Sequence, residues 1–460
     1  MSAIVLLVYL GFLMAILVGN TTKGFFALLM GTILFPCCAL FYESPSISGQ
    51  IVLLYAFIGK EYVMNTHEFK KALSESPLKL FLLLVAFSYA LTTVFNFSAM
   101  NAYYAIRDMV DLYCYFIAAS IASRKLTLKD VSESMYWFVF FMCLYGLYEA
   151  ATNTNILYKV INLAFPAHDG WYNLNSSINA SEGWRIRTII TTKHPTTLGT
   201  LLMVLFMFYW NAFQSKTISY MKNIAILVLL GLNVILSGSR TSLACVAIVL
   251  LYSYMKTKGA LMKILFVGIL IFSASYMVSY TVEHLLDNKD GSSIMLRMTQ
   301  LAFSLEKIKE SPIWGNGSNY TAHQIKDEGV RFNDDDEFIG GLESVAFIYL
   351  IDRGLLGVVT FYLFWLMAFL YLRKNDALFE ERGVTMEIMP MGIILFLTMS
   401  GLIGNNTAFC FLFSGLYIGC IEKKRLEREE KLENEKKAKK TADAETELLP
   451  ETLPEALPEA

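Results

Sequence analysis

Long apolar stretches recur from one end of this 460-residue chain to the other, and they constrain its fold more than any other feature. A helix needs about 20 mostly apolar residues to cross a bilayer. Such stretches occupy residues 3–18, 24–42, 47–59, 78–98, 103–123, 134–152, 196–211, 220–237, 241–256, 260–281, 342–371, 385–402 and 405–421. The sequence therefore predicts an all-α, polytopic helical membrane protein with about 12–14 transmembrane helices.

The charge content excludes two other classes of protein. Only 17% of the residues are charged, whereas a soluble domain typically has about 25%. The formal net charge is −2, and no run of lysine and arginine is interleaved with aromatic residues. A water-soluble enzyme and a basic nucleic-acid-binding protein are therefore both excluded.

The short loops predict the orientation of the chain in the membrane. Loops rich in lysine and arginine alternate with short loops whose only basic residue is Arg240. Because cytoplasmic loops retain positive charge, the basic set and the C-terminus are predicted to be cytoplasmic. The predicted order is helices at 1–152, an outer loop at 153–195, helices at 196–281, a large outer loop at 282–341, helices at 342–421 and a charged cytoplasmic tail at 422–460.

One short outer turn, Leu236–Ser242, combines a glycine with an arginine. Gly238 permits a tight reversal, and Arg240 precedes a helix that Thr241 or Ser242 would cap. A helix N-terminus next to a forked guanidinium suits a phosphate group. The alternative is an arginine that reaches to lipid head groups. We favour the phosphate site because Arg240 is an exception in its set of loops.

A second basic segment leads into the apolar stretch at 196. If it is extended, Arg185 and Arg187 project from one face and are expected to bind an anion together. Pro195 is well placed in the first turn of a helix, where its missing N–H costs little. His194 beside it is either a base or a solvated surface histidine.

The large loop at 282–341 contains a predicted amphipathic helix. Apolar residues repeat at helical spacing over residues 294–308, with Arg297 on the polar face, so the helix is expected to lie along the membrane surface. A turn-rich element, Ser311–Gly317, follows. The acidic run at 334–337 is either a site for a divalent ion or a solvated surface. We favour the solvated surface, because the run lacks the ligand spacing of a calcium loop, and we expect no metal site.

The apolar stretch at 342–371 begins with Glu343-Ser344 and is interrupted near Asp352-Arg353-Gly354. A partly desolvated carboxylate at the outer mouth has a raised pKa, so Glu343 is a candidate general base. It is equally a candidate for a charge that complements the dipole of the helix it opens.

In their order along the chain, these pieces resemble the O-antigen ligase and Wzy-type polymerase superfamily of bacterial membrane glycosyltransferases. Three stretches between residues 185 and 371 carry the resemblance. They are Arg187 through Gly199, Ser237 through Arg240, and Arg297 through Ser311–Gly317 to Glu343-Ser344 and Gly354–Gly357.

The resemblance implies a glycan transfer from an undecaprenyl-diphosphate carrier to an acceptor hydroxyl, at the outer face of the bacterial cytoplasmic membrane, without a metal or another cofactor. It implies that Arg187, Arg240, Arg185 and Arg297 bind the diphosphate and that Glu343, or secondly His194, activates the acceptor. The ligase pattern has His-Asn where this chain has Glu343-Ser344, which favours a polymerase of capsular or exopolysaccharide repeat units. Membrane lipid, a chain-length regulator and a flippase are the expected partners.

Two alternatives stay open. The first is a ligase that moves a finished glycan to a different acceptor. The second is a flippase or another transporter, which is not an enzyme and would place charged residues within its spans. Arg107, Asp108 and Asp111 are candidates for such charges, although Arg107 and Asp111 are spaced to pair on one helix face.

Overall fold

The structure is a computed structural model that describes most of the chain. The described residues are 2–36, 39–41, 47–165, 187–192, 194–256, 258–259, 293–321, 344–375, 378, 385–399 and 405–447.

Helices make up nearly all of the described chain, which confirms the predicted all-α, polytopic class. The described helices are α1 (Ser2–Val18), α2 (Thr21–Leu34), α3 (Gly49–Met64), α4 (Thr66–Ser74), α5 (Lys79–Phe95), α6 (Ala99–Ser123), α7 (Leu128–Thr152), α8 (Ile156–Ala164), α10 (Pro195–Gln214), α11 (Tyr220–Leu236), α12 (Arg240–Lys256), α14 (Ser293–Glu310), α16 (Val345–Asn375), α17 (Ile388–Met399) and α18 (Asn405–Glu447). Two short strands, β1 (Ala39–Phe41) and β2 (Ile47–Ser48), pair antiparallel between α2 and α3.

The predicted apolar stretches match these helices closely. Each of them overlaps a described helix except 260–281, which lies outside the described residues. By length and composition, α10 and α16 are each long and apolar enough to cross a membrane, and α4 with α5 qualify together as a bent pair. Shorter apolar helices include α1, α2, α11 and α17. The loop predicted at 153–195 differs in one respect, because α8 forms within it.

Helix α10 lies at the centre of the bundle. It is apolar on nearly every face, and 83% of its most apolar 18-residue stretch is buried inside the bundle. A helix that is hydrophobic all round is stable only when other helices surround it. Helices α7, α11, α12, α17 and α18 all pack against α10. The N-terminus of α10 is therefore held by the core of the protein.

Small residues let other helices approach closely. Gly415 of α18 lies against the Phe116 carbonyl of α6, and Gly419 lies against Ser123 of the same helix. Close backbone approach at small residues is typical of helices packed in a membrane.

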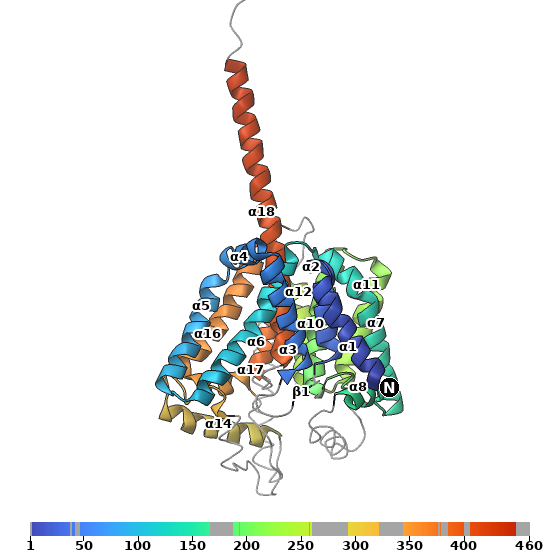
Figure 1. Cartoon of the computed structure of the whole chain (residues 1–460), viewed down its shortest axis with the longest axis vertical. Coiled ribbons are helices and arrows are strands. Elements are labelled where there is room, and N and C mark those ends of the chain that lie inside the picture. The colour runs from blue at the N-terminus through green and yellow to red at the C-terminus, as the bar shows by residue number, and fades with distance from the viewer. Residues whose placement is uncertain are drawn as a thin grey trace, which may run out of the picture.

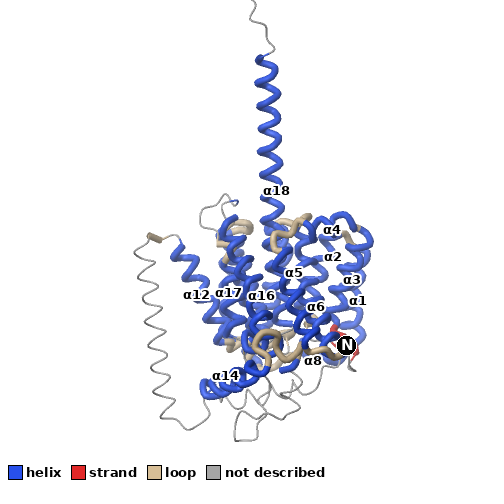
Figure 2. The backbone as a smooth tube through the Cα atoms, turned by 90° about the vertical axis from the view of Figure 1, so that its left-hand side faces the viewer, coloured by secondary structure: helices blue, strands red, loops and turns tan. Residues whose placement is uncertain are grey.

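The bundle has two distinct ends (Figure 1). The charged half of α18 projects from the end that carries α4, and α8 and α14 lie at the opposite end. The view turned by 90° shows the same arrangement, with α14 across the base of the bundle (Figure 2). We call the end with α8 and α14 the loop end and the other the tail end. The helix predicted at 294–308 is confirmed by α14.

Candidate functional site

The side chain of Arg187 crosses the turn between α11 and α12. Gly238 in this turn has a φ of +65°, and a Cβ built there would lie 2.9 Å from Cγ and 3.0 Å from Nε of Arg187. The Thr188 amide donates to the carbonyl of Leu236 at 3.2 Å, which ties the two segments together. Gly238 thus makes the predicted reversal and also leaves room for the arginine.

His194 and Pro195 start α10 at this same place. Pro195 is the first residue of the helix, as predicted, and His194 is its N-cap. The Thr196 amide donates to Nδ1 of His194 at 3.2 Å. Burial, and secondly the charge of Arg187, lower the pKa of His194 to about 4. The neutral imidazole then carries its proton on Nε2, so it is better suited to donate to an anion than to act as a base.

The start of α12 packs directly on the start of α10. A Cβ at Gly199 would lie 2.6 Å from Cβ of Ser239 and 2.6 Å from Oγ of Ser242. The sequence predicted that Thr241 or Ser242 caps α12, but the helix begins at Arg240, so Ser239 takes that position. Its Oγ accepts from the Ser242 amide at 3.4 Å. Two helix N-termini therefore meet next to Arg187.

Of the other predicted site residues, the structure describes the side chain of Arg240 but not those of Arg185, Arg297 and Glu343. Arg240 is exposed, and its side chain has no hydrogen bond or ion pair with the described residues. The side chain of Arg297 on α14 lies outside the description, as do Arg185 and Glu343. Ser344, next to Glu343, is buried, and its Oγ donates to the Thr398 carbonyl of α17 at 2.9 Å.

The predicted interruption of the late helix is real. Gly354 inside α16 has φ +64° and ψ −167°, which breaks the helix. The element Ser311–Gly317 fills this break through three backbone hydrogen bonds. The Asn316 amide donates to the Ile351 carbonyl at 2.8 Å. In the other direction, the Leu355 amide donates to the Pro312 carbonyl at 2.9 Å, and the Leu356 amide donates to the Ile313 carbonyl at 3.2 Å. A Cβ on Gly315 or Gly354 would overlap the backbone of the other segment. Backbone groups freed by the kink are thus paired within the protein, as an apolar environment requires.

Arg353 is buried beside this break. Its guanidinium lies 3.4 Å from the ring centroid of Tyr89 and 4.2 Å from that of Tyr349. Its Nη2 lies 3.8 Å from the Asp108 carboxylate, which also binds Arg107 at 2.9 Å. Arg107 thus pairs with its neighbour Asp108. Its pairing with Asp111 stays a prediction, because the side chain of Asp111 lies outside the described residues.

Comparison with known families gives one match. Residues 225–362 match the model of a family described as O-antigen ligase. The match supports the resemblance to the O-antigen ligase and polymerase superfamily. The match covers the Gly238 turn, the start of α12, α14, the Ser311–Gly317 element and the break in α16. It does not reach Arg187 or His194. No curated protein matches the chain.

The match supports a function of the O-antigen ligase and polymerase type, in a membrane protein. Superfamily members are glycosyltransferase-like enzymes, and their substrates are lipid-linked oligosaccharides in the membrane. Three of the segments that the match covers, the Gly238 turn, the Ser311–Gly317 element and the break in α16, contain glycines with positive φ.

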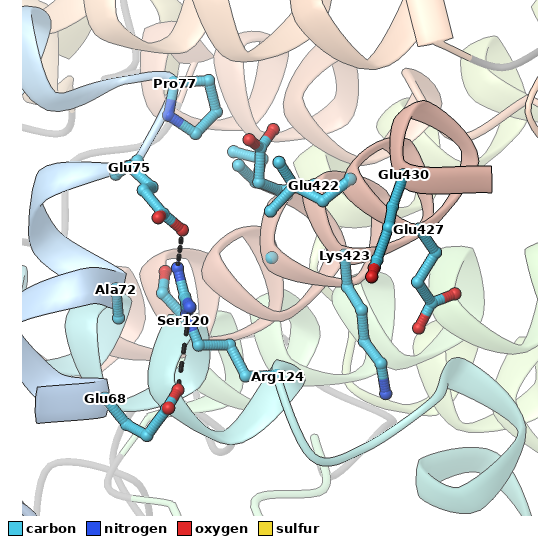
Figure 3. Close-up of a pocket in the computed structure, with 14 residues that line it drawn as sticks. Glu68, Ala72, Glu75, Pro77, Ser120, Arg124, Glu422, Lys423, Glu427 and Glu430 are labelled. Atoms are coloured by element: carbon cyan, nitrogen blue, oxygen red, sulfur yellow. Dashed lines mark hydrogen bonds and ion pairs between the residues drawn. The ribbon is translucent and has the colours of Figure 1, made fainter. Parts of the chain in front are cut away.

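A separate cavity of about 210 Å³ lies at the tail end, between α4, α6 and α18 (Figure 3). Its arginine, Arg124, is already paired with Glu75 at 2.6 Å and with Glu68 at 3.7 Å. Further glutamates of α18, Glu427 and Glu430 among them, line the other side. This excess of carboxylates is unsuited to a diphosphate, so the cavity is not the site expected of this superfamily.

Sequence reasoning missed the residues that hold the Arg187 segment in place. Glu149, near the end of α7, accepts hydrogen bonds from the amides of Ile189 and Ile190. Asn155, just before α8, donates to the Ile190 carbonyl at 2.7 Å. A single glutamate at the end of an apolar stretch is usually interpreted as a charge at the membrane interface. The one hint of another role in the sequence is that this residue is charged within a mostly apolar stretch.

Proposed function

We propose that this protein polymerises undecaprenyl-diphosphate-linked oligosaccharide repeat units into a capsular polysaccharide or exopolysaccharide. The reaction would take place at the outer face of the bacterial cytoplasmic membrane, with the loop end outside and the tail in the cytoplasm. The one observation that carries the proposal is the contact of Arg187 with the Gly238 turn, where the N-termini of α10 and α12 meet.

This arrangement has the electrostatic properties that a diphosphate needs. Helix N-termini carry partial positive charge, and two of them meet here beside Arg187 and His194. Arg240 opens α12 and is exposed at the same turn. Arg185 and Arg297 are proposed as further ligands of the same diphosphate.

The proposed chemistry is a glycosyl transfer. The acceptor hydroxyl oxygen attacks the anomeric carbon of the donor, and the bond from that carbon to the diphosphate oxygen breaks. Undecaprenyl diphosphate leaves with the bonding electron pair, and the arginines stabilise its charge. The hydroxyl proton passes to a base, for which we propose Glu343, because Ser344 anchors that position to α17. His194 is the second candidate, but its Nδ1 is already occupied by the Thr196 amide.

The basic residues of the short loops support this orientation. At the tail end, helix ends carry Lys60, Lys125, Lys222, Lys256 and Arg373. Because basic residues are enriched on the cytoplasmic side, we propose that the tail is inside and the loop end outside.

The two alternatives to a polymerase are a ligase and a flippase. The matched family is described as O-antigen ligase, which favours transfer of a finished glycan as the second candidate. A flippase is less well supported, because Arg353, Asp108 and Arg107 pair with one another and so form a structural cluster.

The direct test is purified protein in lipid nanodiscs with undecaprenyl-diphosphate-linked repeat units. We expect a ladder of longer lipid-linked glycans from the wild type. Arg240→Ala should reduce the rate by roughly 10- to 100-fold, since a hydrogen bond to a charged group is worth about 1.5–3 kcal/mol. Arg373→Ala, an exposed arginine at the tail end, is the matched control and should leave the rate unchanged. A full ladder from Arg240→Ala would contradict the proposal, and a single transfer to another acceptor would identify a ligase.

A further inference from the structure

The segment that carries Arg187 contains a strained residue. Ile190 has a φ of +52°. This left-handed conformation is rare for a β-branched residue, because its Cβ crowds the backbone. Ile190 is also buried, and its Cδ1 would lie 3.1 Å from a Cβ at Gly146 of α7. Such a conformation persists only where the surrounding structure holds it.

Glu149 provides that restraint. One carboxylate oxygen accepts from the Ile189 amide at 3.1 Å, and the other accepts from the Ile190 amide at 2.9 Å. The side chain is 3% exposed, so it is buried behind the segment. Two consecutive amides that point at one carboxylate fix the backbone on both sides of Ile189.

Neighbouring contacts extend the restraint to both sides of the strained residue. Asn155 donates to the Ile190 carbonyl at 2.7 Å, and the Thr191 hydroxyl donates to the Ile33 carbonyl of α2 at 2.7 Å. On the other side, the Thr188 amide bonds to Leu236 at the end of α11. Arg187 is the next residue, and its side chain lies on Gly238.

We propose that Glu149 is a positioning residue for the diphosphate site. It holds the Ile189–Ile190 turn in its strained form, and that turn sets the direction from which Arg187 crosses the Gly238 turn. The inference rests on the proposed function for the identity of the ligand. Because Glu149 is buried behind the segment, it acts through Arg187 and does not bind the substrate.

A double-mutant cycle with Glu149→Gln and Ile190→Gly tests this role. Glutamine keeps one acceptor oxygen but turns an NH₂ group toward the second amide. Glycine adopts positive φ without strain, so the turn no longer depends on the carboxylate. The two readouts are the affinity for undecaprenyl diphosphate in nanodiscs and hydrogen exchange of the peptide that covers residues 187–192.

We expect Glu149→Gln to weaken undecaprenyl diphosphate binding at least tenfold and to speed exchange in residues 187–192. In the Ile190→Gly background, the same substitution should weaken binding less than threefold. Glu387→Gln is the matched control, because Glu387 is a fully buried glutamate at the tail end that binds Lys256. It should lower the melting temperature without changing the affinity, which separates positioning from general loss of stability.

Unchanged exchange in residues 187–192 of Glu149→Gln would overturn the inference, and so would an equal loss of affinity in both backgrounds. Failure of the proposed function would look different. In that case the wild-type protein itself would bind no undecaprenyl diphosphate, while the exchange rates would still decide whether Glu149 holds the segment.

Discussion

Arg187 lies against Gly238, and the glycine's positive φ and missing side chain are both needed for that contact. The contact joins the segment before α10 to the turn before α12. It brings an arginine next to two helix N-termini that are distant in sequence, and the proposed diphosphate site depends on it.

Gly238→Ala should therefore weaken the site more than the fold. A methyl group would enter the space occupied by the Arg187 side chain, and an L-residue at this φ costs roughly 1–2 kcal/mol. We expect glycan elongation to fall about tenfold or more, with the protein still inserted and folded. Gly11→Ala is the control, because nothing lies within 4 Å of a Cβ at Gly11. Normal elongation by Gly238→Ala would show that the contact is dispensable.

Gly315→Ala should act on the fold. A Cβ there would overlap the backbone of Arg353, and the residue's φ is +73°. Because the Ser311–Gly317 element satisfies the backbone at the break in α16, its displacement exposes unpaired groups, each worth several kcal/mol in an apolar environment. We expect a large loss of thermal stability in detergent or failure to accumulate. Gly59→Ala, with open space around its Cβ, should behave like the wild type.

Arg353, Asp108 and Arg107 form a cluster of charges in which two substitutions should lower stability to different extents. Asp108→Ala removes the ion-pair partner of the buried Arg353, and breaking a buried pair on one side typically costs about 3–5 kcal/mol. Arg353→Met leaves Asp108 paired with Arg107, and a methionine thioether makes favourable contacts with aromatic rings such as those of Tyr89 and Tyr349. We expect Asp108→Ala to lower the melting temperature clearly more than Arg353→Met. The reverse order would mean that Arg353 is held mainly by the aromatic rings.

His194 predicts an unusual pH profile. Its pKa is lowered to about 4 by burial and by Arg187, so the imidazole stays neutral well below pH 6.5. Since an unfolded histidine binds its proton at higher pH, this group's contribution to stability is complete above about pH 6.5 and is lost as pH falls toward 4. His194→Asn keeps an N-cap residue and should flatten the melting temperature between pH 4.5 and 6.5. An activity step near pH 6.5 that this variant removes would contradict the lowered pKa.

Local sequence patterns predicted much of the fold. Apolar length gave the helices, Gly238 the short turn, Pro195 the start of α10, and the Asp352-Arg353-Gly354 sequence the break in α16. Each of these features depends on neighbouring residues in the chain. The predicted cap of α12 lies two or three residues too late, because several hydroxyl residues are adjacent and only their geometry selects Ser239.

Long-range relationships were not predictable in this way. Nothing local to Arg187 shows that it lies on Gly238, and nothing local to Ser311–Gly317 shows that it fills the break at Gly354. In both contacts a distant segment packs closely against a glycine. The residue types alone do not show which segment approaches which glycine. Glu149 was missed for the same reason, since its partners are backbone amides that carry no residue signature.

The central claim is that Arg187 and Arg240 hold the same diphosphate. The most direct test is the affinity for undecaprenyl diphosphate of the wild type, Arg187→Ala, Arg240→Ala and the double variant in nanodiscs. We predict that each single substitution weakens binding roughly 10- to 100-fold and that the double variant is weaker than either but clearly less than the product of the two effects, since groups that bind one ligand are coupled. Binding that is unchanged in either single variant, or effects that multiply without coupling, would contradict the account.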